Sequence, residues 1–360
     1  MVKPIKKYFV CANSCNGFVN YFPSNLDGMD RVYILKGGPG TGKSTLMKKV
    51  GESFAAAGEQ VEYIYCSSDS SSLDGVILRD RKIAIVDGTA PHVVEPKAPG
   101  AVEEYVNLGT AWNRNMLAEH KTEIMSVSAQ ISERYSEVYR LLAEAKAVHD
   151  RWEKIYLDNI NFDTLNHISE DLNTEVLHDM AESDKKGKSV HRFFGALTPD
   201  GSVNYIENLT EDISVRYFIK GRPGTGKSSI MKKLAARAND CGIDAEVYHC
   251  SFDPDSLDMV ILPSLDICIF DSTAPHEIFP SRNGDIILDV YDAAVKPGTD
   301  EDNADTLYEI SKEYDAPIER AKKLLAEIHS LHNELEGYYI KAVDFSMIDG
   351  ITKRLINNIR

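Results

Sequence analysis

Two stretches of the sequence have the residue types and spacing of a phosphate-binding loop. The first comprises Gly37, Gly38, Pro39, Gly40, Thr41, Gly42, Lys43, Ser44 and Thr45, and the second comprises Gly221, Arg222, Pro223, Gly224, Thr225, Gly226, Lys227, Ser228 and Ser229. In such a loop the glycines let backbone amides surround phosphate oxygens, and the lysine reaches the β- and γ-phosphates. A glycine-rich turn that binds nothing is the alternative. The pattern occurs twice, which favours two sites for a nucleoside triphosphate.

Four side chains are candidates for a Mg²⁺ site beside these loops. The hydroxyls of Ser44 and Ser228 directly follow the two lysines, where such loops contact Mg²⁺. Asp87 and Asp271 each follow four apolar residues, as a Walker B aspartate does, although aspartate also favours turns at strand ends. Neither aspartate is followed by a water-activating glutamate. The sequence therefore predicts Mg²⁺ binding but leaves the hydrolytic base open.

Other carboxylates are available as a general base. Asp69 and Asp253 occur in Cys-Ser-x-Asp segments after the second predicted strand, and they are the preferred candidates. Asp74 and Asp258 lie five residues further along in Ser-Leu-Asp. Asp69 and Asp253 also suit helix or turn caps, so cap and catalytic roles stay open for them.

Histidines and arginines near these motifs have alternative roles. His92 and His276, in two Thr-Ala-Pro-His segments, can donate to a phosphoryl oxygen or stabilise their loops. Arg222 can contact a phosphate or extend into solvent. Arg79 and Arg81 occur only in the first copy, and they serve as arginine fingers if the two cores face each other.

The elements that position these residues belong to a duplicated unit. At an offset of 184, residues 8–96 align with 192–280 without a gap, and roughly two in five positions are identical. We therefore expect two α/β domains, residues 1–191 and 192–360, each a P-loop NTPase repeat with a three-layer α/β/α core and a mainly parallel sheet. The cores are expected at about residues 8–100 and 192–283.

Local patterns predict the parts of each core. Asn16-Gly17 and Asp200-Gly201 each lie between apolar stretches, which is typical of a type I′ β-hairpin. Apolar runs at 32–35 and 217–219 predict strands that enter the glycine-rich loops, with helices beginning at Ser44 and Ser228. Further strands are expected at 61–65, 83–86, 245–249 and 267–270.

The remainder of each repeat, at 101–183 and 284–360, is predicted to be helical. Apolar residues recur every three or four positions from Ile124 to Ile155 and from Leu307 to Leu335. Helices of this length are expected to project from or bridge the cores. Packing of each helix on its own domain and pairing of the two helices are the alternatives.

Composition narrows the class of protein. The 360 residues carry 40 Lys and Arg against 56 Asp and Glu, a net charge of −16, which disfavours nucleic acid as a partner. The six cysteines are dispersed and no apolar run suits a membrane span, so we expect a cytoplasmic protein without membrane contact. A protein partner at the helical segments and an intramolecular pseudo-dimer of the repeats are further expectations.

At GGPGTGKST, GRPGTGKSS and the two TAPH segments, the chain resembles a family of tandem P-loop ATPases of spore-forming Gram-positive bacteria. The resemblance covers both copies and implies ATP binding by P-loop folds. A looser similarity is to tandem RecA-like ATPases, in which an acidic residue after the second strand activates water. The short segment between the second strand and the Walker B aspartate departs from that pattern.

Three functions are compatible with these residues. The preferred one is an ATPase that uses Mg²⁺ and moves its long helices; no Asn-Lys-x-Asp sequence for reading guanine occurs, which disfavours GTP. The second is a kinase that transfers a phosphoryl group to a small acceptor, favoured by the missing glutamate. The third is a scaffold that binds nucleotide without turnover.

Overall fold

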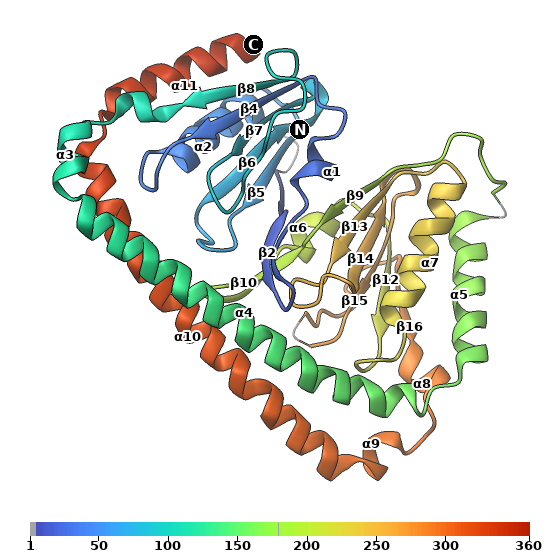
Figure 1. Ribbon diagram of the computed structural model, residues 1–360. Coiled ribbons are helices and arrows are strands. Elements are labelled where there is room, and N and C mark those ends of the chain that lie inside the picture. The colour runs from blue at the N-terminus through green and yellow to red at the C-terminus, as the bar shows by residue number, and fades with distance from the viewer. Residues whose placement is uncertain (1–4, 179, 275) are drawn as a thin grey trace.

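The computed structural model describes residues 5–178, 180–274 and 276–360. It contains two α/β cores of similar architecture, which meet at one edge of each sheet and are spanned by two long helices (Figure 1). The predicted α/β class and tandem arrangement are therefore observed. The boundary that we expect near residue 191 falls within β9 (Ser189–Arg192), an edge strand of the second sheet.

Each core is built on a six-stranded mixed sheet. In spatial order the first sheet comprises β1 (Lys6–Phe9), β5 (Val61–Tyr65), β6 (Leu73–Leu78), β7 (Ile83–Asp87), β4 (Arg31–Lys36) and β8 (Glu103–Asn107). The second comprises β16 (Asp285–Asp289), β12 (Val215–Lys220), β15 (Ile267–Asp271), β14 (Leu257–Leu262), β13 (Ala245–His249) and β9. Most neighbours are parallel, but β6 and β14 run antiparallel to both of their neighbours.

The antiparallel strands β6 and β14 are the main departure from the predicted sheet. A helix normally connects parallel strands, whereas here the chain returns through the sheet itself as a short buried strand. This explains why the segments before Asp87 and Asp271 are too short for the expected crossover. It also places Asp74 and Asp258 inside the sheet rather than in a loop.

The helix after each glycine-rich loop covers one face of its sheet. These helices are α2 (Lys43–Ala55) and α7 (Lys227–Asp240), and they bury their apolar faces against the sheet strands. The opposite faces of the two sheets share one core with the short helices α1 (Phe22–Leu26) and α6 (Ile206–Thr210), which take the place of the second helical layer expected for a three-layer core. Three further short helices precede the long ones, α3 (Arg114–Glu119), α8 (Val290–Ala294) and α9 (Thr299–Asp302).

Both predicted hairpins are present, with a different turn. They pair β2 (Cys11–Ser14) with β3 (Gly17–Asn20), and β10 (Gly195–Thr198) with β11 (Gly201–Asn204). Gly17 and Gly201 have φ of +89° and +97°, whereas the residues before them are not left-handed. A type I′ turn needs positive φ at both central residues, so the prediction of that turn type was wrong.

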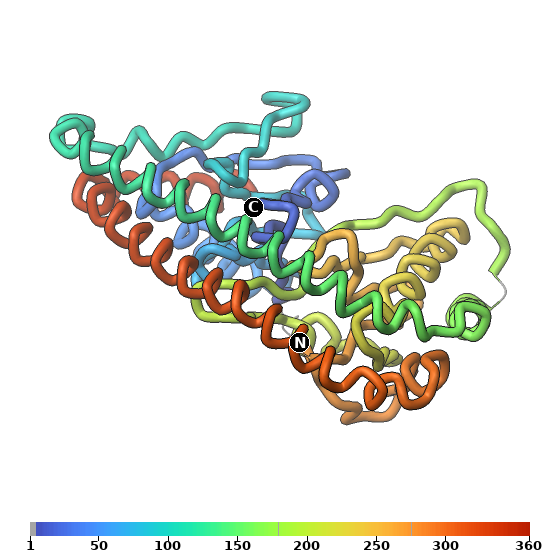
Figure 2. The backbone as a smooth tube through the Cα atoms, turned by 60° about the horizontal axis from the view of Figure 1, so that its bottom comes forward, coloured from blue at the N-terminus to red at the C-terminus, as the bar shows by residue number. Residues whose placement is uncertain are grey.

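The long helices α4 (Lys121–Leu157) and α10 (Ala304–Ala342) pack against each other along both cores (Figure 2). Their shared core includes Val138 and Leu141 from α4 with Leu325 and Ile328 from α10. The helices are antiparallel, since Arg134 pairs with Glu327 at 3.1 Å while the later Arg151 pairs with the earlier Glu313. Pairing of the two helices is thus the alternative that the structure selects.

Helices α4 and α10, called the crossed helices below, each run from their own core to the other core. The terminal helix of each repeat therefore packs on the core of the other repeat. Helix α5 (Phe162–Leu177), which follows α4, packs on α7 of the second core, where Leu165 and Leu172 are buried. Helix α11 (Phe345–Ile359), which follows α10, packs on α2 of the first core, where Leu355 is buried. Each spatial unit therefore combines segments from both sequence repeats.

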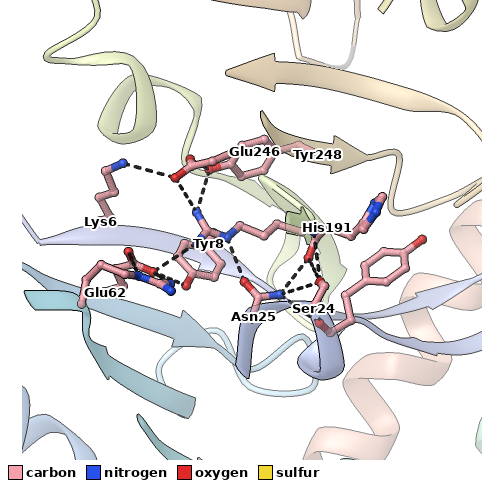
Figure 3. A network of polar contacts seen from close by, with 11 residues as sticks. Lys6, Tyr8, Ser24, Asn25, Glu62, His191, Glu246 and Tyr248 are labelled. Atoms are coloured by element: carbon pink, nitrogen blue, oxygen red, sulfur yellow. Dashed lines mark hydrogen bonds and ion pairs between the residues drawn. The ribbon is translucent and has the colours of Figure 1, made fainter. Parts of the chain in front are cut away.

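The two sheets also meet directly. The amide of Phe9 donates to the carbonyl of Phe193 at 2.9 Å, and the reciprocal bond is 2.8 Å. Beside this bridge, Glu62 and Glu246 point into one buried polar network from the two cores (Figure 3). The guanidinium of Arg192, only 2% exposed, lies 3.3 Å from the Glu62 carboxylate and 3.1 Å from that of Glu246. The joint is thus both hydrogen-bonded and ionic.

Candidate functional site

Each glycine-rich loop connects a central strand to the helix on the sheet face. In the first loop Gly40 and Gly42 have φ of +65° and +86°. The Thr41 hydroxyl donates to the carbonyl of Gly38 at 2.8 Å and closes the loop on itself. The second loop repeats this geometry with Gly224 at +77°, Gly226 at +87° and a 2.8 Å bond from Thr225 to Arg222. The remaining predicted positions follow the same order, with Pro39, Pro223 and Gly221 in the loops and Thr45 and Ser229 exposed in the first helical turn.

The loop lysines Lys43 and Lys227 lie between their loops and the aspartates Asp87 and Asp271. Lys43 Nζ donates to the carbonyls of Gly37 and Gly38, both at 2.9 Å, and lies 3.5 Å from Asp87 Oδ2. Lys227 Nζ likewise lies 3.4 Å from Asp271 Oδ2. Parallel pairing places these groups together, because Leu35 at the end of β4 is in register with Asp87 at the end of β7.

The residues predicted to hold Mg²⁺ fit that ion by their chemistry. Asp87 Oδ1 accepts from the amide of Thr89 at 2.8 Å, which leaves Oδ2 facing the lysine. Ser44 Oγ accepts from the amide of Leu73 at 3.0 Å, and Ser228 Oγ accepts from Leu257 at 2.9 Å. Hydroxyl and carboxylate oxygens are the ligands that Mg²⁺ prefers.

A second aspartate is buried beside each of Asp87 and Asp271. Burial raises the pKa of Asp74, with a further contribution from Asp87. Burial and the charge of Asp271 raise the pKa of Asp258 to about 8. Asp74 Oδ2 is a buried oxygen without a hydrogen-bond partner among the described residues. These aspartates therefore differ in environment from the exposed turn residues that a Ser-Leu-Asp sequence favours.

The predicted histidines lie against these buried aspartates. His92 Nε2 is 3.5 Å from Asp74, and His276 Nε2 is 3.9 Å from Asp258. Burial lowers the pKa of His276, which keeps the imidazole neutral. The Nδ1 atoms of both rings are buried without a hydrogen-bond partner in the described part of the chain. A buried aspartate beside a histidine therefore occurs in both copies, as Asp74 with His92 and as Asp258 with His276.

Asp69 and Asp253, the preferred bases, form turn caps. The Asp69 carboxylate accepts from the amide and hydroxyl of Ser71 at 2.9 and 2.8 Å, and from the hydroxyl of Ser72 at 2.5 Å. Burial opposes ionisation of Asp69, but these bonds prevail and its pKa is lowered. Asp253 accepts from the amide of Asp255 at 3.2 Å. The structure thus supports the alternative role, capping, for both residues.

The arginines singled out in the sequence are occupied by carboxylates. Arg222 contacts Asp300 at 2.9 Å and lies over the ring of Tyr291, and its side chain stays half exposed to solvent, which agrees with the solvent alternative. Arg79 pairs with Glu62 at 2.6 Å, and Arg81 pairs with Glu59 at 2.8 Å. Arg81 also donates to the backbone carbonyl of Ile359 at 2.7 Å. With both guanidinium groups held by these partners, the structure gives no support to the arginine-finger interpretation of Arg79 and Arg81.

Sequence reasoning missed the helical residues that cover the loops. A methyl group added at Gly40 would lie 3.1 Å from the backbone oxygen of Glu336, and one at Gly38 would lie 2.6 Å from the Tyr339 ring. At Gly224 it would lie 2.5 Å from the backbone oxygen of Glu153. The signal was a His-x-x-x-Glu-x-x-Tyr pattern, at 149–156 and 332–339, which the duplication repeats at an offset of 183.

Comparison with known proteins gives a local match. A family model described as nephrocystin 3, N-terminal, matches residues 20–78, which include the first glycine-rich loop and the strand before it. Searches of curated proteins and of solved structures returned no significant match. The matched family differs from the one that the sequence motifs resemble. In the described residues, no helix is both long and apolar enough to cross a membrane.

Proposed function

We propose that the chain binds two molecules of ATP with Mg²⁺, one at each glycine-rich loop, in tandem P-loop NTPase domains, and hydrolyses them. The observation that carries the proposal is the position of each loop lysine. Lys43 and Lys227 lie within hydrogen-bond distance of loop carbonyls and within 3.5 Å of Asp87 and 3.4 Å of Asp271, respectively. A cation held between a glycine loop and an acidic metal ligand is the arrangement that triphosphate binding requires.

The residues of the chain have separate tasks in this proposal. Lys43 and the loop amides bind the β- and γ-phosphates, while Ser44 and Asp87 hold the metal. Mg²⁺ bound there would neutralise charge on the phosphate oxygens. Lys227, Ser228 and Asp271 take the same tasks in the second copy, so both sites carry a complete binding set.

Nucleotide binding is proposed to move the crossed helices. Tyr339 and Glu336 of α10 pack on the first loop, and Glu153 of α4 packs on the second. A triphosphate entering either loop meets these side chains, so its binding energy depends on where the helices lie. Hydrolysis then changes which helix position is favoured, and the paired helices transmit that change between the cores.

The test measures phosphate release by the purified chain with Mg²⁺ and each of four nucleoside triphosphates. We expect turnover with ATP that falls in Lys43→Ala and in Lys227→Ala, and that disappears in the double variant. Lys232→Ala is the matched control, since Lys232 is exposed on the same helix as Lys227. ATP consumption that requires an added small acceptor would favour the kinase, and binding without turnover would favour the scaffold.

A further inference from the structure

The helix that covers each loop carries one glutamate at an equivalent position. Glu336 of α10 lies at the first loop and Glu153 of α4 lies at the second. Because α4 and α10 cross, each glutamate belongs by sequence to the repeat opposite the loop it covers. Both side chains are neither fully buried nor fully exposed. The backbone of a glutamate therefore packs on each loop, at Gly40 and at Gly224, although no glutamate follows Asp87 or Asp271 directly.

The surroundings of Glu336 connect it to the expected phosphate position. Burial raises the pKa of Glu336, the charge of Asp69 adds to this, and the Gly40 amide and Lys43 ammonium partly oppose it. The Glu336 carboxylate is thus within hydrogen-bonding reach of the Gly40 amide, and it interacts electrostatically with the Lys43 ammonium group. Burial likewise raises the pKa of Glu153, and the charges of Lys146 and, more weakly, Lys227 oppose that shift. The Glu153 carboxylate lies 3.7 Å from Nδ1 of His149 on the same helix.

These contacts suit a base better than those of Asp69. The oxygens of Asp69 are engaged by its own turn at 2.5–2.9 Å, so that carboxylate has little capacity to accept a proton. The Gly40 amide that Glu336 approaches is part of the loop that would receive a phosphate.

We propose that Glu336 and Glu153 are the general bases of ATP hydrolysis, each acting at the loop of the opposite repeat. The water oxygen forms a bond to the γ-phosphorus, and the bond from that phosphorus to the β–γ bridging oxygen breaks. The electron pair of the broken bond leaves with ADP, and the proton of the water passes to the glutamate and then to solvent. This inference rests on the proposed function. It assigns residues to the activation of water, the step for which the sequence left the general base open.

The test uses the full chain and steady-state phosphate release with Mg²⁺ and ATP. In Lys227→Ala, whose remaining turnover comes from the first loop, adding Glu336→Gln should lower kcat by about 100-fold. In Lys43→Ala, adding Glu153→Gln should do the same. Glu334→Gln, an exposed glutamate on the same helix as Glu336, is the control that should leave kcat unchanged. Glu336→Asp, which keeps a carboxylate, should restore at least part of the loss.

Binding measurements separate a base from a structural residue. Glu336→Gln should still bind two nucleotides per chain, with affinity equal to or tighter than that of the unmodified chain. Loss of binding in this variant would overturn the assignment, as would full turnover. If Glu153→Gln, rather than Glu336→Gln, lowers kcat in the Lys227→Ala background, the assignment of each glutamate to the loop of the opposite repeat is overturned. No turnover in the unmodified chain would refute the proposed function, whereas turnover that survives both glutamate substitutions would refute this inference alone.

Discussion

Replacing Arg192 with methionine should destabilise the joint between the two cores. The methionine side chain would fill a similar volume without charge, leaving the carboxylates of Glu62 and Glu246 in a buried site. Burial alone would raise the pKa of Glu62, but the charges of Arg192 and Arg79 lower it to about 2. Glu62 would keep Arg79 at 2.6 Å, and Glu246 would keep Lys6 at 3.5 Å. Removing one partner from a buried ion pair costs about 3–5 kcal/mol, and the retained cations place this case near the lower figure.

The assay is equilibrium urea unfolding followed by circular dichroism at pH 7. We expect the free energy of unfolding in the first transition to be about 3 kcal/mol lower for Arg192→Met than for the unmodified chain. The control is Arg31→Met, because Arg31 pairs with Glu104 at 3.7 Å on the surface, where the expected loss is below about 1 kcal/mol. The stabilising ionised form of Glu62 exists above its unfolded pKa and is lost as the pH falls toward 2. A loss below about 1 kcal/mol for Arg192→Met at pH 7 would refute the reasoning.

Three further perturbations test other parts of the structure. Because burial raises the pKa of Asp258 to about 8, the free energy of unfolding of the unmodified chain should fall as the pH rises from 5.5 to 8. This group contributes at most about 1.4 kcal/mol per pH unit, and urea unfolding of Asp258→Asn should show a smaller decline over the same pH range. Gly224→Ala should destabilise the chain more than Gly201→Ala in thermal unfolding, since both glycines have positive φ but only Gly224 faces the α4 backbone; equal losses would contradict the contact. Removing residues 344–360 should increase amide hydrogen exchange in α2 and not in α7, because α11 packs on the first core; increased exchange in α7 instead would contradict the exchange of terminal helices.

The loops and their neighbouring strands were predictable because their signals are local. Glycines at fixed spacing, the apolar run before them and the helix after them require no knowledge of distant contacts. Strand β4 lies close to its predicted range, and α2 begins one residue before its predicted start. The proximity of Lys43 to Asp87 also follows, since adjacent parallel strands bring their carboxyl ends together.

The exchanged helices were not predictable from these patterns. An amphipathic helix presents the same apolar face whether it packs on its own core or on the other one, so the sequences of α5 and α11 do not distinguish the two arrangements. Strand β6 was missed because Leu73–Leu78 is a short apolar run between two strands that were expected to be parallel neighbours. The roles of Glu153 and Glu336 depend on the crossing of the helices, which periodicity alone does not specify.

The most direct measurement is the stoichiometry of ATP binding in the presence of Mg²⁺, determined by calorimetric titration of the purified chain. Binding by two separate loops predicts two nucleotides per chain, one in Lys43→Ala, one in Lys227→Ala and none in the double variant. Two nucleotides in each single variant, or no binding by the unmodified chain, would contradict the account.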